Sequence, residues 1–182
     1  MPVVSAAVSL ILISLDTTRS SNTVDRKIHY NMIAVYCLMI LFWSGLVMHS
    51  IARDTFIAYL PVFFSSFAFI PVFLYRITHI ITDTGERKLF PACHFILPAC
   101  LTLIICAIAL AVPLRQRWAA IYDNEVNLTS AIIDITFIVC ILLCILYSWL
   151  SLLRIKSYKR KIIDYSADIY RMSLDWLSFI IL

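Results

Sequence analysis

The sequence predicts an all-α protein, a polytopic bundle of transmembrane helices whose N-terminus lies outside the membrane. Of its 182 residues, 62% are hydrophobic and only 14% are charged, and the mean hydropathy is +0.92. A soluble globular domain usually carries about 25% charged residues. Four apolar runs also reach the roughly 17 to 25 residues that a helix needs to cross about 30 Å of hydrocarbon. These observations exclude a water-soluble fold.

The four full spans are predicted at residues 31–49, 55–75, 91–113 and 128–153. Two shorter apolar stretches, 2–15 and 176–182, are too short to cross a bilayer at 1.5 Å per residue, so each predicts a partial terminal span. The first stretch lacks the positively charged leader of a signal peptide, which favours a short or N-terminally clipped first helix. Because the last stretch stops soon after it begins, we expect the sequence to be the N-terminal part of a longer protein.

The orientation follows from the distribution of basic residues. The connecting segments after the first, third and fifth apolar stretches hold twelve of the 15 Lys and Arg residues, and the other two segments hold three. Cytoplasmic loops carry an excess of Lys and Arg, so the segments after the first, third and fifth apolar stretches are predicted to be cytoplasmic. The predicted organisation is a transmembrane bundle at 1–153, a basic amphipathic juxtamembrane segment at 154–175 and the start of a further span at 176–182.

The juxtamembrane segment combines an apolar stripe at spacings of three and four residues with a basic cluster: Arg154, Lys156, Lys159, Arg160 and Lys161. A straight helix would carry its far end roughly 30 Å from the membrane, where the next apolar stretch has to begin. We therefore expect either a helix that lies in the membrane interface or a hairpin broken near residues 164–166. The basic residues are either lipid-headgroup contacts, at about 1 kcal/mol each, or an ordinary topology signal.

Asp134 is the one acidic residue deep within a predicted span. An ionised side chain there is costly unless it faces other helices or water, which makes it a candidate ligand or proton site. Asn127 and Ser130 precede it at spacings that place them towards the same side of the helix. A polar seam that packs against neighbouring helices is the alternative.

Several classes of function find no support in the sequence. Two glycines are too few for a Gly-rich phosphate loop or a dinucleotide fingerprint. The six cysteines lie within apolar runs without the spacing of a metal site, and we interpret them as small hydrophobic residues. No catalytic arrangement or nucleic-acid recognition motif is present. We therefore expect a protein that is not an enzyme, binds no metal or cofactor and contacts no nucleic acid through this chain.

Two short motifs flank the third connecting segment. Pro71 and Tyr75 end one span with the spacing Pro-x-x-x-Tyr, and His94, Phe95 and Pro98 begin the next as His-Phe-x-x-Pro. This pattern resembles the N-terminal membrane domain of bacterial AraC-type transcription regulators. The resemblance implies a sensor in the bacterial inner (plasma) membrane that signals to a cytoplasmic helix-turn-helix domain, which these 182 residues do not contain.

The favoured interpretation is thus a membrane sensor or anchor domain of a signal-responsive transcription regulator, in contact with membrane lipid. Whether it forms a homodimer is left open, as are the signal ligand and the target genes. The alternative is a small transporter or channel-like protein that uses Asp134. Corresponding broken helices in the two halves of the chain would favour a transporter, and the sequence offers none.

Overall fold

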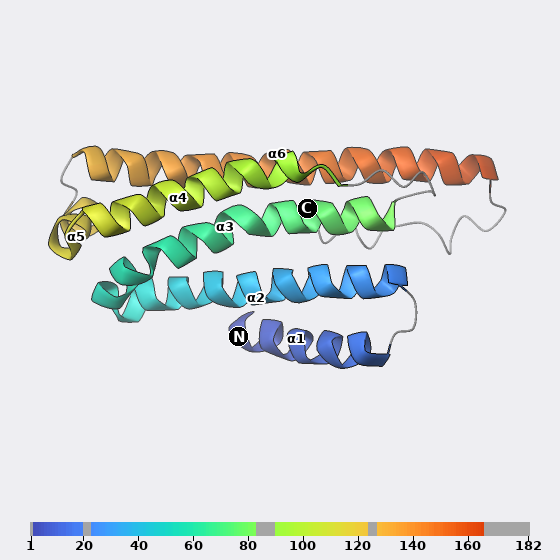
Figure 1. Cartoon of the computed structure of the whole chain (residues 1–182), viewed down its shortest axis with the longest axis horizontal. Coiled ribbons are helices and arrows are strands. Elements are labelled where there is room, and N and C mark those ends of the chain that lie inside the picture. Colours follow the sequence, from blue (N-terminus) through green and yellow to red (C-terminus); the bar gives the residue numbers. More distant parts are fainter. Residues whose placement is uncertain (1, 20–22, 83–89, 124–126, 166–182) are drawn as a thin grey trace.

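The fold is described from a computed structural model that covers residues 2–19, 23–82, 90–123 and 127–165. Every element in these ranges is helical: α1 (Pro2–Arg19), α2 (Thr23–Ile51), α3 (Arg53–Ile81), the short 3₁₀ helix η1 (Ala92–Phe95), α4 (Ile96–Ala111), α5 (Leu114–Tyr122) and α6 (Leu128–Tyr165). The long helices lie side by side along one axis and form an elongated bundle (Figure 1). The predicted all-α class is confirmed.

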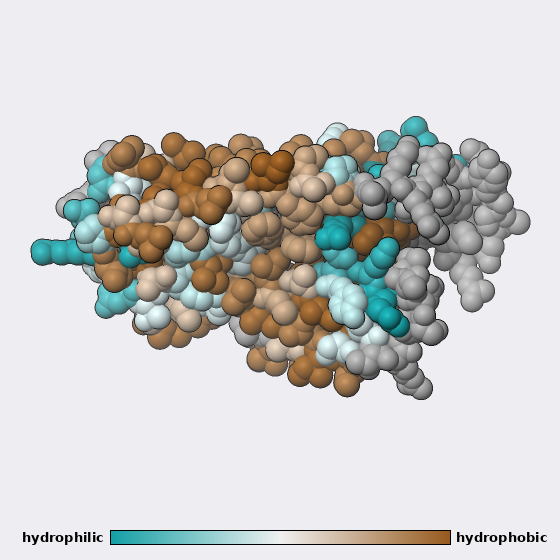
Figure 2. Space-filling model, in the orientation of Figure 1, coloured by the Kyte–Doolittle hydropathy of each residue, from teal (hydrophilic) through white to brown (hydrophobic). Residues whose placement is uncertain are grey.

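Four helical segments are long and apolar enough to cross a membrane: Arg26–Ile51, Arg53–Ile81, Ala92–Ala111 and Leu128–Arg160. All four overlap the predicted spans, which are thereby confirmed. Large apolar side chains such as Leu103 and Leu110 are exposed on the outside of the bundle. Hydrophobic surface covers much of the middle of the long axis, whereas hydrophilic residues gather towards its two ends (Figure 2). Such a belt is suited to hydrocarbon, and the protein is a membrane protein with transmembrane helices.

The first helix, α1, is shorter than its neighbours and packs along one part of α2 (Figure 1). Its apolar stretch, Val4–Thr17, is too short to count among the full spans. Ala6 is buried, and Asp16 Oδ2 lies 3.4 Å from His29 Nε2 on α2. The predicted partial terminal span is therefore present as a helix.

Helices α2 and α3 form a tight antiparallel pair because only Ala52 separates them. Gly45 of α2 faces α3 in this interface. A Cβ atom at this position would stand 2.5 Å from Phe63 Cδ2 and 3.3 Å from Tyr59 Cε1. The hydroxyl groups of Tyr59 and Ser44 are 2.9 Å apart across the same interface. A small residue next to interhelical hydrogen bonds is the usual way in which membrane helices pack closely.

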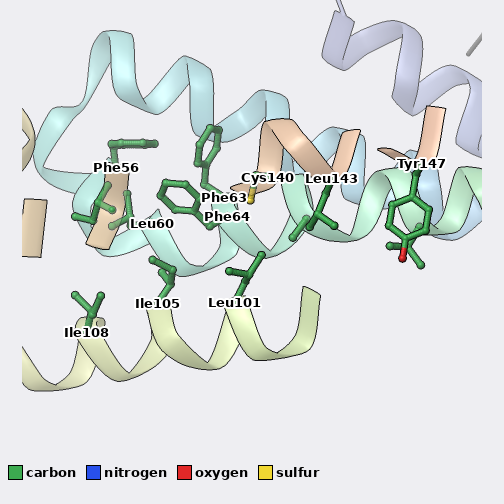
Figure 3. Close-up of a cluster of buried hydrophobic side chains, with 13 residues drawn as sticks. Phe56, Leu60, Phe63, Phe64, Leu101, Ile105, Ile108, Cys140, Leu143 and Tyr147 are labelled. Atoms are coloured by element: carbon green, nitrogen blue, oxygen red, sulfur yellow. The ribbon is translucent and has the colours of Figure 1, made fainter. Parts of the chain in front are cut away.

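The core forms around α3, which packs against α2, α4, α5 and α6. Buried side chains from three helices meet there (Figure 3): Phe56, Leu60, Phe63, Phe64, Ala68 and Val72 of α3, Leu101, Ile105 and Ile108 of α4, and Ile133, Cys140, Leu143 and Tyr147 of α6. Tyr147 brings a hydroxyl group to the edge of this otherwise apolar cluster. It connects the core to the polar contacts described below.

Two expectations are corrected by the structure. The fourth connecting segment contains the helix α5, and Arg117, which was counted as an ordinary loop charge, is buried there. The chain also continues as one helix of 38 residues through α6 to Tyr165, so an interfacial helix beginning at Arg154 is wrong for this part. No Gly or Pro interrupts residues 128–165, and the helix therefore continues. The predicted break near residues 164–166 coincides with the last helical residue described, and the rest of the segment lies outside the described residues.

Candidate functional site

The two motifs that flank the third connecting segment come together in space. Tyr75 at the end of α3 contacts His94 of η1, with ring centroids 5.4 Å apart. Tyr147 of α6 completes the group, at 5.6 Å from Tyr75 and 5.7 Å from His94. Pro71 and Pro98 are both buried, and each lies four residues along the chain from one of these rings, Tyr75 or His94. Tyr75 and His94, one from each motif, thus form one contact region with Tyr147, which joins three elements of the bundle.

Pro98 removes the usual hydrogen-bond donor of a backbone carbonyl, and the hydroxyl of Tyr147 donates to that carbonyl instead. In an α-helix the N–H of residue i+4 donates to the carbonyl of residue i, but Pro98 has no N–H, so the carbonyl of His94 lacks this donor. The hydroxyl of Tyr147 lies 3.3 Å from that carbonyl oxygen and 3.2 Å from Nδ1 of His94. Both hydrogen bonds form together when His94 Nδ1–H donates to Tyr147 and Tyr147 donates to the carbonyl. This arrangement also tolerates a proton on Nε2, so the doubly protonated imidazole keeps both hydrogen bonds.

Further aromatic and basic side chains surround this pair. Phe90 packs on His94 at 5.0 Å and on the buried His79 at 5.5 Å between ring centroids. The guanidinium of Arg76 lies 5.9 Å from the Phe90 ring and 5.8 Å from the Phe95 ring, within the range of cation–π contact. We call Tyr75, His79, Phe90, His94, Phe95 and Tyr147 the His94 cluster. Among the described residues no group of three His, Cys, Asp or Glu side chains could hold a metal ion.

Of the basic side chains predicted to meet lipid headgroups, one makes a contact within the bundle and two are exposed. Nε of Arg154 donates to Thr82 Oγ1 at 2.7 Å, and Thr82 in turn donates to the carbonyl of Thr78 at 2.7 Å. Arg154 therefore ties α6 to the end of α3. Lys156 and Arg160 are exposed on α6 and remain candidates for headgroup contact. Lys159 is half-buried, and the side chain of Lys161 lies outside the described residues.

The predicted ligand or proton site does not form one group. Asn127 Oδ1 accepts from the N–H of Ser130 at 2.9 Å, and Ser130 Oγ accepts from the N–H of Asn127 at 3.1 Å. This reciprocal pair is a capping box, which supplies partners for N–H groups at the start of a helix. Asp134 lies further along α6 and is exposed, whereas Thr136 is buried. Asn127 and Ser130 therefore cap α6, and Asp134 stands apart from them on its outer surface.

A second contact at the other end of the bundle was missed by the sequence analysis. Arg117 of α5 is 6% exposed, and its Nη1 donates to the carbonyl of Ile57 at 3.1 Å. Its Nε donates to the carbonyl of Val112, also at 3.1 Å. Residue 61 is proline, so the Ile57 carbonyl lacks its helical donor in the same way as that of His94. The signal in the sequence was Pro61, which identifies a carbonyl without its helical donor but not the side chain that replaces that donor.

The chain can also be compared with known proteins. A scan against protein-family models finds no match, and searches of the curated proteins and of the solved structures find no similar protein. The resemblance to AraC-type membrane domains therefore rests on the motif residues alone.

Proposed function

We propose that the protein is the membrane sensor domain of a signal-responsive regulator in the bacterial inner membrane. The observation that carries the proposal is the course of α6. The helix runs unbroken from Leu128 through the membrane span to Tyr165, a length of about 57 Å at 1.5 Å per residue. It is therefore considerably longer than the roughly 30 Å of hydrocarbon. A shift of α6 within the membrane would move its extension beyond the membrane by the same amount.

The His94 cluster supports the proposal because it connects this helix to the rest of the bundle. Tyr147 lies on α6. Both of its hydrogen-bond partners, Nδ1 and the carbonyl oxygen, belong to His94 on η1, which continues into α4. Tyr75 and Arg76 add contacts from α3 to the same cluster. A change in the packing of α3 or α4 would thus alter contacts that hold α6 in position. On the resemblance to AraC-type regulators, the output is a DNA-binding domain outside these 182 residues.

A transporter that uses Asp134 has less support. Transport through a helix bundle needs polar groups that line a path between helices. Asp134 instead lies on the outer surface of α6. No broken pair of spans is seen among the described helices, since the four candidate spans are each continuous.

The proposal is tested by replacing Tyr147 in a bacterium that encodes the protein. We expect Tyr147→Phe to alter a discrete set of transcripts, measured by RNA sequencing, because the link between α6 and η1 is weakened. Tyr30→Phe is the matched control, since Tyr30 is exposed on α2 and 59% of its surface is accessible. Immunoblots of the membrane fraction establish that the variants accumulate equally. If deletion of the gene changes no transcripts and Asp134→Asn abolishes movement of a solute, the transporter is the correct interpretation.

A further inference from the structure

Asp134 lies on a face of α6 that no described part of the chain covers. Its neighbours along this face, at spacings of four, seven and eleven residues, are large apolar side chains that are exposed: Ile138 at 54%, Ile141 at 39% and Ile145 at 61%. The helix forms one edge of the bundle (Figure 1). Within the described ranges, no hydrogen bond or ion pair joins the carboxylate of Asp134 to another residue. The carboxylate therefore stands alone in an apolar stripe.

The position of Asp134 along α6 places it within the apolar span Leu128–Arg160. It follows Leu128, the first residue of the span, by six positions, which is roughly 9 Å along the helix axis. Ionisable side chains within transmembrane segments are costly and are almost always paired or turned towards an interior. A carboxylate on the outer face satisfies this rule only if a partner helix covers it. The chemistry that fits it best is a cation at the same depth.

A second copy of this chain does not offer such a cation from its spans. In the spans Arg26–Ile51, Arg53–Ile81, Ala92–Ala111 and Leu128–Arg160, the one basic residue at the end of the bundle where Asp134 lies is Arg53, the first residue of its span. The others lie towards the opposite end, away from Asp134 in a copy of the same orientation: Arg26, Lys27, Arg76, Arg154, Lys156, Lys159 and Arg160. Two copies packed through α6 would instead bring one carboxylate near another, and like charges repel at short range. Charge complementarity therefore favours a helix from a different protein, with a Lys or Arg about 9 Å inside its own end.

The surface on the other side of Asp134 from the capping box is a shallow apolar groove along α6. The groove has a volume of about 870 Å³ and is lined almost entirely by apolar side chains, among them Leu97 of α4 and Val139, Leu142, Ile145 and Trp149 of α6. It continues the stripe on which Asp134 lies. Membrane helices associate through close van der Waals packing together with a few interhelical polar contacts. The groove supplies a surface for van der Waals packing, and Asp134 supplies a polar contact.

We propose that this face of α6 docks a single transmembrane helix of another protein, and that a Lys or Arg of that helix pairs with Asp134. The proposal does not rest on the proposed sensor function. A transporter with an accessory subunit would show the same surface. The proposal requires that the carboxylate of Asp134 pairs with a basic residue at the same depth in the partner helix.

Synthetic transmembrane peptides test this requirement directly. The full chain is placed in liposomes with fluorescent Leu/Ala helices that are flanked by tryptophans and carry one Lys about 9 Å from an end, or Leu at that position. We expect the Lys peptide to bind about three- to twenty-fold more tightly, the range of polar contacts between membrane helices. Energy transfer between labels measures binding. Asp134→Leu should remove the preference without weakening the Leu peptide.

A change of register provides the matched control. Combining Asp134→Leu with Ile138→Asp moves the carboxylate one helical turn, because residues four apart share a face. The preference should then move to a peptide whose Lys lies one turn deeper. Circular dichroism of each variant establishes that the helical content is retained. A preference that follows the carboxylate supports the proposal.

Three results would overturn it. Equal binding of the Lys and Leu peptides to the wild-type chain removes the charge complementarity. Energy transfer between differently labelled copies of the chain that is lost in Asp134→Leu identifies a second copy as the occupant. A photocrosslinker at position 134 that captures residues 166–182 of the same chain shows that the chain covers this face itself.

Discussion

Replacement of Tyr147 by Phe removes one hydroxyl group and leaves the ring in place. That hydroxyl lies 3.3 Å from the carbonyl oxygen of His94 and 3.2 Å from its Nδ1. Polar contacts between membrane helices contribute about 0.6 kcal/mol on average and up to about 1.7 kcal/mol. Because Pro98 cannot donate to this carbonyl, Tyr147→Phe removes the side-chain donor that takes the place of its N–H. We therefore expect Tyr147→Phe to lower the free energy of unfolding by about 1 to 2 kcal/mol.

The physical reason can be tested separately from the size of the effect. Pro98→Ala restores an N–H that can donate to the His94 carbonyl, so the hydroxyl of Tyr147 is then needed only for Nδ1. In the presence of Pro98→Ala, we expect the cost of Tyr147→Phe to fall by about half. The double-mutant cycle cancels the packing that is lost with the proline ring, since that loss occurs in both arms.

The measurement is reversible unfolding of the purified protein in bicelles by added sodium dodecyl sulfate, followed by circular dichroism. The four free energies of the cycle give the coupling between positions 98 and 147. Distant, independent sites add within about 0.3 to 0.5 kcal/mol. If Tyr147→Phe costs the same with and without Pro98→Ala within that error, the hydroxyl does not replace the missing helical donor and the reasoning is refuted.

Two further predictions concern the contacts of α3 and use the same unfolding assay. Gly45→Ala should destabilise the protein by about 1 to 3 kcal/mol, because the added Cβ would stand 2.5 Å from Phe63 Cδ2, and Phe63→Leu should restore part of the loss. A fully neutral Gly45→Ala would show that the two helices are less closely packed. Arg117→Met should cost about 1.5 to 3 kcal/mol because the Ile57 carbonyl loses a charged donor. Pro61→Ala should reduce this cost, and an unchanged cost would count against a role for the proline.

The spans and the all-α class could be predicted because they depend on local properties. A run of apolar residues of sufficient length forms a membrane helix whatever its neighbours are, and the four runs all do so. The continuation of α6 was predicted wrongly for a different reason. The prediction assumed that the chain has to return to the membrane near residue 176, and it gave this assumption more weight than local helix propensity. Residues 154–165 contain several Lys and Arg but no helix breaker, and propensity prevails there.

The candidate site was predictable only in part. The motif positions Tyr75 and His94 were singled out, and they do lie in contact. Tyr147 was not, because its role depends on which helix packs opposite Pro98, and that is a property of the fold. Arg117 was missed in the same way, since its acceptor on α3 is 60 residues away in the sequence. Sequence patterns identify the prolines that leave carbonyls without donors, but not the side chains that replace the donors.

These contacts also bear on how the helices are held in register. Lipid tails are as apolar as leucine, so apolar packing alone gives membrane helices little reason to prefer one alignment over another. Polar groups that need a partner do impose an alignment, and the described bundle has such pairs at both ends: Arg117 with Ile57, and Arg154 with Thr82. Each fixes α5 or α6 relative to α3. Asp134 has the same need but no partner among the described residues, and by the same reasoning it would fix the alignment of whatever helix covers it.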